Sequence, residues 1–188
     1  TLVPSELKHS AAKGYKAGNE VVITGKDLDL VTGIKIGEEA VAEFTSDKNG
    51  IKFNLSATVK DGDLIISLAN GKTEKVGTKI EMVKPTITAL SVTQIMAGET
   101  FEIEGTDLDL VTKVVLKDKA CEFKYDETTK KITVTTANTS QTGKVTIETQ
   151  NGTTVVSEAE VVIEYDSLVI VTTLTTSASI GDEVTMTG

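Results

Sequence analysis

The chain has 188 residues, with 19 Lys and Arg against 28 Asp and Glu, and a formal net charge of −9. All of the basic residues are lysine, and an acidic chain without arginine is a poor candidate for recognising phosphate groups or nucleic acid. The 30 Thr, 21 Val and 15 Ile are β-branched, which favours pleated, half-buried strands. No apolar run approaches the ~20 residues of a membrane-spanning helix. Composition therefore predicts an all-β chain that does not bind nucleic acid, and it indicates no function.

Short strands separated by glycine-marked turns are predicted along the chain. Two sets of strands are expected, the first at 20–24, 31–37, a segment ending in Phe44, 51–55, 64–68 and 79–83, and the second at 100–104, 111–117, a segment ending in Phe123, 132–134, 144–148 and 155–163. Gly25 and Gly105 are expected to end the strands that precede them. The Asn-Gly pairs at 70–71 and 151–152 predict two-residue hairpin turns with positive φ at both positions.

The chain repeats itself. Residues 17–32 (AGNEVVITGKDLDLVT) recur as residues 97–112 (AGETFEIEGTDLDLVT), an offset of 98 − 18 = 80. A third copy opens at 180–188, at an offset of 181 − 98 = 83 from the second. A period of this length exceeds the roughly 20–50 residues of solenoid repeats and suits a small autonomous β domain.

The domain limits follow from this repeat. We predict one domain at 1–83, a second at 84–165, and the opening strands of an incomplete third domain at 166–188. Pro4 and Pro85 open the first two domains, and proline fixes its own φ and restricts the residue before it. The joints are short and lack the Gly/Ser composition of a flexible linker, so we expect a semi-rigid rod.

About seven short strands in each repeat indicate a small immunoglobulin-like β-sandwich. The order of turn and strand signals resembles the IPT/TIG family of immunoglobulin-like domains. In the second repeat the sequence positions that carry this resemblance are Pro85, Ala97-Gly98, Gly105, 111–116, Gly143 and Asn151-Gly152. The first repeat differs from this pattern by one extra residue before Gly18 and another before Phe44. At the position of the family's G-x-N-F motif, this chain has Gly-x-Asp-Leu-Asp-Leu. The resemblance implies tandem immunoglobulin-like sandwiches.

Acidic tandem domains of this kind resemble the stalk of bacterial outer-membrane surface lipoproteins, above all surface glycan-binding proteins of polysaccharide-utilisation systems. The resemblance implies a non-catalytic spacer on the extracellular side of the outer membrane, lipid-anchored upstream of this chain. It also implies outer-membrane partner proteins, and a carbohydrate bound by a domain outside this chain. A cell-adhesion or protein-binding module is the alternative, with a sheet face or a domain joint as the contact. Accessory domains of a secreted polysaccharide-degrading enzyme are a third interpretation.

One acidic motif is shared by both repeats. It places Asp27 and Asp29 in the first copy and Asp107 and Asp109 in the second. In an extended segment these i and i+2 carboxylates point the same way, roughly 7 Å apart, and with backbone carbonyls they could bind Ca²⁺. Alternatively, the intervening leucines fill the core while the aspartates cap the turn or face water. The motif lacks the glycine and final glutamate of an EF-hand loop.

No residue is assigned a catalytic, cofactor-binding or metal-binding role. His9 is the only imidazole and is expected in the first strand, half-buried or exposed, since its counterpart at an offset of 81 is Leu90. Cys121 is the only cysteine, with no neighbouring base, and is expected to be a small buried hydrophobe. The sequence also lacks a G-x-S-x-G nucleophile turn, and we therefore expect no enzyme activity and no cofactor.

Sugar binding by surface proteins commonly uses flat aromatic platforms, and this chain has no Trp. Tyr15, Tyr125 and Tyr165 are scattered along the sequence, and Tyr165 is expected to pack between domains. The four phenylalanines, at core-facing strand positions, are Phe44, Phe53, Phe101 and Phe123. We therefore expect no glycan platform in this chain.

The last residues match the first two strands of a repeat. Residues 168–188 carry a row of apolar side chains with nothing after them to complete a core. An isolated strand pair is marginal in water. We expect these residues to be the start of a third sandwich or to lie against a neighbouring molecule, and not to join the second sandwich.

Overall fold

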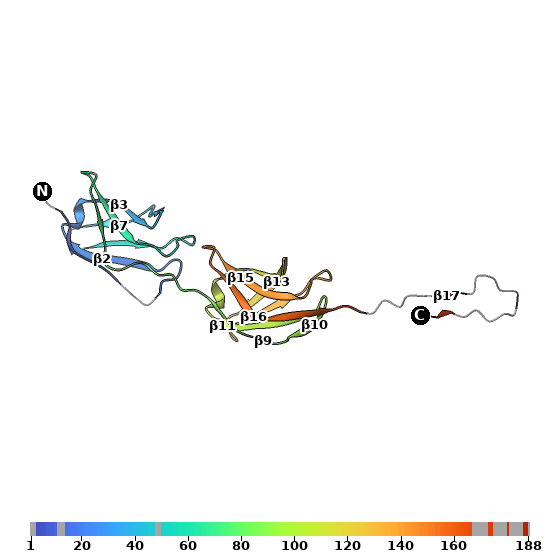
Figure 1. Cartoon of the computed structure of the whole chain (residues 1–188). Coiled ribbons are helices and arrows are strands. Elements are labelled where there is room, and N and C mark those ends of the chain that lie inside the picture. Colours follow the sequence, from blue (N-terminus) through green and yellow to red (C-terminus); the bar gives the residue numbers. More distant parts are fainter. Residues whose placement is uncertain are drawn as a thin grey trace.

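The structure, a computed structural model, describes residues 3–10, 14–47, 50–166, 173–174, 180 and 186–187. Two β-sandwiches follow one another along the chain and lie end to end (Figure 1). We call strands β1–β8 the first sandwich and strands β9–β16 the second sandwich. The predicted all-β, immunoglobulin-like fold class is confirmed. Among the described residues, no helix has the length and hydropathy that crossing a membrane requires.

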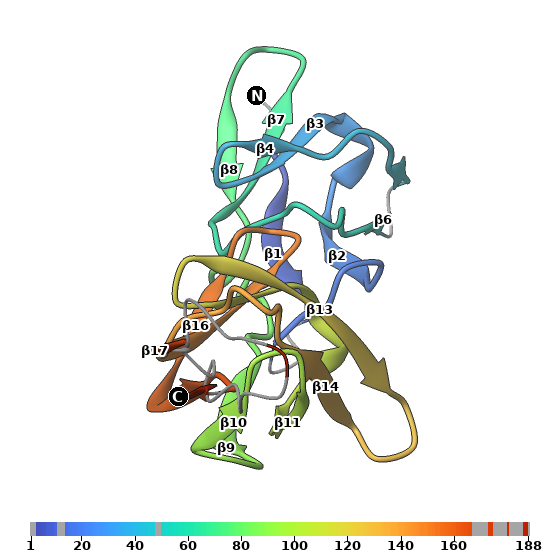
Figure 2. The same cartoon turned by 90° about the vertical axis from the view of Figure 1, so that its right-hand side faces the viewer.

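The first sandwich consists of two four-stranded sheets, ordered β1-β2-β6-β5 and β4-β3-β7-β8. Figure 2 shows β3, β4, β7 and β8 above the layer that holds β1, β2 and β6. A short 3₁₀ helix, Leu28–Leu30, connects β2 to β3 and thereby links the two sheets. The strands are β1 (Ser5–His9), β2 (Glu20–Lys26), β3 (Val31–Ile36), β4 (Glu39–Ala40), β5 (Thr45–Ser46), β6 (Ile51–Asn54), β7 (Leu64–Leu68) and β8 (Thr73–Lys75).

The second sandwich repeats this plan with longer strands. Its strands run in the order β10-β16-β15-β12-β13-β14-β11-β9, because the long strand β13 pairs with β12 through its first half and with β14 through its second. A second 3₁₀ helix, Leu108–Leu110, lies between β11 and β12. The strands are β9 (Thr86–Leu90), β10 (Gln94–Met96), β11 (Thr100–Thr106), β12 (Val111–Leu116), β13 (Lys119–Asp126), β14 (Lys131–Thr135), β15 (Gly143–Thr149) and β16 (Thr154–Glu164).

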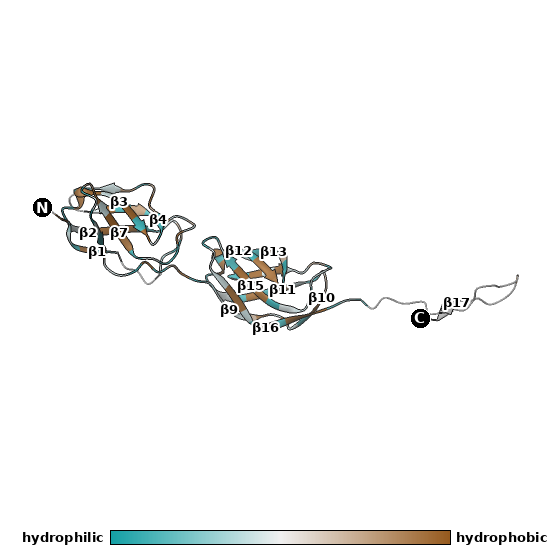
Figure 3. Cartoon of the chain, turned by 45° about the horizontal axis from the view of Figure 1, so that its top comes forward, coloured by the Kyte–Doolittle hydropathy of each residue, from teal (hydrophilic) through white to brown (hydrophobic). Residues whose placement is uncertain are grey.

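Each sandwich has its own hydrophobic core. The period-two alternation of the sequence places every second side chain inward: in Leu64–Leu68 the first, third and fifth residues are buried. Figure 3 shows the hydrophobic residues concentrated in the strands of both sandwiches. The buried apolar residues form two separate clusters. The residues of one cluster come from the sequence range 15–82, and those of the other come from the range 95–163. Burial of each Val, Leu or Ile side chain contributes about 1.5–3 kcal/mol to the free energy of folding. Each sandwich is therefore stabilised by its own core.

Two predicted turn features differ from the structure. Gly71 and Gly152 both have φ of +80°, but the asparagines before them do not have positive φ. In the first hairpin Gly71 N–H donates to Leu68 O and Leu68 N–H to Lys72 O, both at 2.9 Å, so the loop has three residues and ends in a bulge. The prediction of a two-residue turn was therefore wrong, because only the glycine needs the left-handed conformation.

Gly25 and Gly105 do not end their strands. Each lies within its strand at an irregularity of the pairing with the preceding strand. A Cβ atom on Gly105 would lie 1.8 Å from the carbonyl oxygen of Thr86. Glycine is required there because the backbones of two strands approach each other closely.

The strand predicted at 79–83 is also not formed as a regular element. Gly77 has φ of +57°, which ends the extended run after β8. The following segment makes isolated bridges, Ile80 with Gly62 and Met82 with Tyr15. Because these partners belong to different parts of the sandwich, no continuous ladder forms.

The prediction for 168–188 falls largely outside the described residues. The parts that the structure describes include β17 (Thr173–Leu174) and β18 (Met186–Thr187), which pair with each other antiparallel. Their sheet has two strands and is not joined to the sheet of the second sandwich.

Candidate functional site

Side chains from both sandwiches meet at the joint between them. Lys16, just before the first copy of the repeated motif, lies with its Nζ 2.8 Å from Asp107 Oδ1 and 3.1 Å from Asp109 Oδ2 of the second copy. The hydrogen bond to Asp107 is the main cause that raises the pKa of Lys16; partial burial opposes it, and Asp109 adds to it. The lysine is therefore charged at neutral pH and forms a two-carboxylate ion pair across the joint.

A second contact crosses the joint through the loop between β15 and β16. Asn151 Nδ2 donates a hydrogen bond of 3.1 Å to the carbonyl oxygen of Val59. The amide is oriented by Thr149, whose hydroxyl donates to Asn151 Oδ1 at 2.6 Å. The Asn-Gly pair of the second repeat thus serves a contact between sandwiches in addition to its own turn.

The covalent connection is short and is held against the first sandwich. Tyr15 N–H donates to Glu81 O at 2.9 Å, and Val83 N–H donates to Tyr15 O at 2.8 Å. Only Val83, Lys84 and Pro85 separate the bridge at Met82 from the start of β9. Pro85 is buried, so the chain enters the second sandwich with little freedom.

Asp61 fixes the same connection from the side. It accepts a hydrogen bond from Met82 N–H at 2.8 Å and pairs with Lys84 Nζ at 2.9 Å. Partial burial alone would raise the pKa of Asp61, but the Met82 N–H and the Lys84 ammonium outweigh it and hold the pKa below its ordinary value. The carboxylate is therefore ionised at neutral pH and stabilises the path of the linker.

The joint encloses a hollow of about 230 Å³ lined by residues of both sandwiches, among them Tyr15, Met82, Leu110 and Asn151. The hollow is small compared with the ~300–1,000 Å³ of most ligand sites. The joint is therefore best described as a contact surface between two sandwiches.

The backbone of the Asp-Leu-Asp motif is not extended, as the sequence predicted, but turns in both repeats. Asp27 and Asp107 have φ of +58° and +52°, and a 3₁₀ turn follows each of them. The interpretation that leucines fill the core is confirmed, because Leu28 and Leu108 are 0% and 1% exposed. Neither aspartate caps its turn through a side-chain hydrogen bond.

Calcium binding at this motif remains untested. In the second copy the Lys16 ammonium pairs with both carboxylates, which places a positive charge where a cation would lie. Within the described part of the chain, no three His, Cys, Asp or Glu side chains come together in a way that could hold a metal ion.

His9 and Cys121 lie where the sequence placed them. His9 ends β1 and is half-buried, with Nδ1 3.2 Å from the Tyr15 hydroxyl and Nε2 2.8 Å from the Thr78 carbonyl oxygen. Cys121 is 9% exposed, and burial raises the pKa of its thiol. His9 is thus held by hydrogen bonds within the first sandwich, and Cys121 belongs to the core of the second sandwich.

The aromatic residues are mostly taken up by the cores. Tyr15 is 4% exposed, and Phe53 and Phe101 are 4% and 1% exposed. Tyr125 packs partly against the second core. Tyr165 is 54% exposed, and its hydroxyl donates a hydrogen bond to the carbonyl oxygen of Ser140 in a loop of the second sandwich. The prediction that Tyr165 packs between domains concerns residues outside the described part of the chain.

The sequence did not identify Lys16 and Asn151 as contact residues. The sequence contains one indication of the lysine contact. The residue before the Ala-Gly pair is Lys16 in the first repeat and Met96 in the second, so the two copies differ in charge at this position. Only the packing of the sandwiches places this lysine beside the second copy of the acidic motif.

No protein-family model and no curated protein sequence matches the chain. Among solved structures, SGBP-B from a complex xyloglucan utilization locus in Bacteroides uniformis is 14% identical, with a TM-score of 0.39, over 86% of this chain and 50% of that chain. The surface glycan-binding protein PbSGBP-B from Prevotella bryantii is 16% identical, with a TM-score of 0.41, over 86% and 42%. The extracellular region of plexin A4 is 16% identical, with a TM-score of 0.41, over 81% and 15%.

The chain therefore spans half or less of the length of these three structures. At these identities the likeness is one of fold, and it extends to a plexin as well as to surface glycan-binding proteins. Surface glycan-binding proteins, the class that the sequence pattern resembles, are among the solved structures that match the chain.

Proposed function

We propose that the two sandwiches are a non-catalytic spacer that holds a glycan-binding domain, outside this chain, away from a bacterial cell surface. In this proposal the domains are residues 1–83 and 84–165, and 166–188 open a third. The polysaccharide-utilisation setting, the lipid anchor upstream and the outer-membrane partners come from the resemblance to the stalk of surface glycan-binding lipoproteins. The names of the structures from B. uniformis and P. bryantii belong to the same setting.

The observation that carries the spacer proposal is the contact at the joint. A spacer must keep a distance and a direction, which a flexible linker does not do because its ends approach each other freely. Here the linker is three residues long and bound at Met82 and Lys84, and Lys16 and Asn151 bridge the two sandwiches. An exposed ion pair contributes about 0.2–1 kcal/mol and a hydrogen bond about 1 kcal/mol, so these contacts bias the joint while the short linker limits its range.

Small-angle X-ray scattering on the chain tests this proposal. We expect the scattering profile of the wild-type protein to fit one arrangement of the two sandwiches. Replacing both bridging residues, Lys16→Ala with Asn151→Ala, should broaden the distribution of interdomain distances, because only the linker then restrains the joint. The control Lys113→Ala removes the exposed pair with Glu148 inside the second sandwich and should leave the profile unchanged.

Two results would contradict the spacer proposal. One is a wild-type profile that requires a wide ensemble of joint angles at low salt, where the Lys16 ion pair is least screened. The other is a double variant whose profile is identical to that of the wild type, which would mean that the bridging contacts do not hold the joint.

A further inference from the structure

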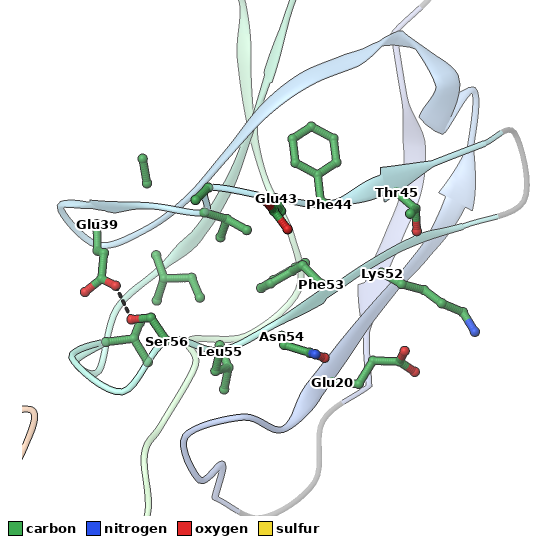
Figure 4. A pocket seen from close by; sticks show the side chains of 15 residues that line it. Glu20, Glu39, Glu43, Phe44, Thr45, Lys52, Phe53, Asn54, Leu55 and Ser56 are labelled. Atoms are coloured by element: carbon green, nitrogen blue, oxygen red, sulfur yellow. Dashed lines mark hydrogen bonds between the residues drawn. The ribbon is translucent and has the colours of Figure 1, made fainter.

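The first sandwich contains a hollow of about 710 Å³ that a spacer does not require (Figure 4). It lies between the segment that joins β4 to β5 and the outer edge of β6. Figure 4 shows Glu39 at one end, Glu20 and Lys52 at the other, and Phe53 and Leu55 between them. Its volume falls within the ~300–1,000 Å³ of sites that bind a ligand or a side-chain anchor.

The hollow exists because the two sandwiches differ at one strand. In the second sandwich β13 is continuous: Leu116 pairs with Lys119, and further along Phe123 pairs with Val134. In the first sandwich the equivalent strand is broken into β4 and β5. Four residues lie between them, and of these Val41 still donates a backbone hydrogen bond to Ile34 of β3. The break places the hollow where the second sandwich has uninterrupted sheet.

One extra residue accounts for the break. Glu39 corresponds to Lys119 at an offset of 80, but Thr45 corresponds to Lys124 at an offset of 79. The sequence Val41-Ala42-Glu43-Phe44 therefore has one residue more than Cys121-Glu122-Phe123, and Ala42 is the addition. One added residue reverses the inward and outward sides of a strand, and the chain leaves the sheet instead.

The break leaves an edge of β6 without a partner. β5 pairs with β6 only at Thr45↔Lys52 and Ser46↔Ile51, whereas the same ladder in the second sandwich continues for two more pairs at this end, as far as Glu122↔Thr135. Over the described residues, no backbone hydrogen bond joins 42–44 to β6. On its other side β6 is paired with β2 as far as Asn54. An unpaired strand edge is a template for another extended chain.

The lining has the chemistry of a peptide site. The floor is apolar and well packed, with Phe53 and Leu55 each 4% exposed and Val59 2% exposed. The rim has three carboxylates, Glu20, Glu39 and Glu43, against the single ammonium of Lys52. Glu39 is held in place by hydrogen bonds from Ser56 and Thr58. An apolar floor with a net acidic rim complements an apolar side chain flanked by basic ones.

We propose that this hollow is the docking site for an extended, basic segment of a partner protein. The segment adds as a short strand along the open edge of β6 at Phe53 and Asn54, and rests one apolar side chain on the floor. Its lysine or arginine side chains face Glu20 and Glu43. This is strand addition, in which backbone hydrogen bonds give affinity and pockets give specificity. A second copy of this chain, with a net charge of −9, is a poorer electrostatic partner than a basic segment.

A pair of synthetic peptides tests the proposal on the whole chain. The first alternates valine with lysine, the second alternates valine with glutamate, and both have blocked ends. Calorimetry should show saturable binding of the lysine peptide and binding of the glutamate peptide weaker by about tenfold or more. NMR should show the largest amide shifts at Phe53 and Asn54.

Deletion of Ala42 is the matched variant, because it restores the spacing of the second repeat. We expect the deletion to join β4 to β5 into one strand, to leave the melting temperature equal or higher, and to weaken binding of the lysine peptide by about tenfold or more. The charge variant Glu43→Gln should weaken it several-fold. Its control Glu122→Gln, at the equivalent place in the unbroken strand, should have no effect.

The proposal is overturned if the lysine peptide does not bind, or if it binds equally after deletion of Ala42. Should that deletion fail to fold, the Glu43→Gln and Glu122→Gln pair and the NMR shifts decide alone. Glycan binding, or self-association in the ultracentrifuge, that is lost on deletion of Ala42 would assign the hollow to another occupant. The peptide-binding results test the docking site alone, and scattering tests the spacer proposal separately, whereas glycan binding in the hollow would contradict both proposals.

Discussion

At the scale of single residues, close approaches of backbone decide which positions tolerate a side chain. The two repeats have the same glycine at the pairing irregularity of β2 and of β11, but the available space differs. A Cβ atom on Gly25 would lie 2.9 Å from Ser5 O, whereas one on Gly105 would lie 1.8 Å from Thr86 O. The second sandwich is therefore the less tolerant of the two at this position.

We expect Gly105→Ala to destabilise the second sandwich by about 3 kcal/mol, because β9 must move away from β11 to admit the methyl group. Chemical denaturation measures this loss. Gly33→Ala is the control: its Cβ would meet Ser67 at 3.7 Å, an ordinary contact, and its stability should be unchanged or slightly higher. Equal stability of the two variants would show that the β9–β11 approach is looser than the structure has it.

At the scale of elements, the carboxylate of Asp61 holds the segment that connects the two sandwiches. This segment is not part of a regular strand, and Asp61 supplies the hydrogen bond and ion pair that a neighbouring strand would otherwise provide. The 3₁₀ turns behave similarly in both repeats, but only the second lies against Lys16. That the Asp-Leu-Asp turns bind no calcium stays a prediction, which melting in millimolar Ca²⁺ tests.

We expect Asp61→Asn to lower the free energy of unfolding of the first sandwich by about 1–2 kcal/mol at pH 7, since a charged acceptor is lost. The folded-state pKa of Asp61 lies below its ordinary value, so its stabilisation is full above about pH 4 and is lost as pH falls through the folded-state pKa. Unfolding curves at several pH values should show the wild type and variant converging only under acidic conditions.

The control for this prediction is Asp63→Asn, which removes an exposed pair with Lys75. It should change stability by no more than about 0.5 kcal/mol at neutral pH. If Asp61→Asn behaved in the same way, the Met82 and Lys84 contacts would contribute nothing to the linker.

At the scale of the whole molecule, two cores joined by a short bridge give an elongated body (Figure 1). The acidic composition keeps its surface charged. The side chains that bridge the two sandwiches come from both repeats, Lys16 from the first and Asp107, Asp109 and Asn151 from the second. The joint and the hollow are neighbours on this body: Val59 accepts the hydrogen bond of Asn151 at the joint and contributes its side chain to the floor of the hollow.

We expect the chain to show no appreciable affinity for polysaccharides in affinity gels or calorimetry against plant and microbial glycans. Its aromatic side chains serve mainly the cores, and Tyr15 is buried. Saturable binding that Tyr125→Ala abolishes would contradict the spacer proposal. Tyr15→Ala is not a suitable probe alone, because loss of a core side chain costs about 3–5 kcal/mol of stability.

The sequence by itself predicted the fold class, the repeat and most strand positions, because alternation and glycine-marked turns are local signals. The strands at 64–68 and 155–163 formed within one residue of their predicted limits, while 79–83 did not form a ladder. That failure has a physical cause: Gly77 turns the chain toward two different partners, and strand pairing depends on neighbours that are distant in sequence.

The candidate surfaces were decided by tertiary structure. The sequence showed an extra residue before Phe44, but an added residue can be absorbed as a bulge or can break a strand. Here Val41 N–H donates a hydrogen bond of 2.9 Å to Ile34 O, and Thr45 pairs with Lys52. Because both ends are held in this way, the residues between them leave the sheet and open the hollow. Likewise, the sequence shows a lysine and two aspartates 91 and 93 residues further on (107 − 16 = 91, 109 − 16 = 93), and only the packing of one sandwich on the next brings their charges together.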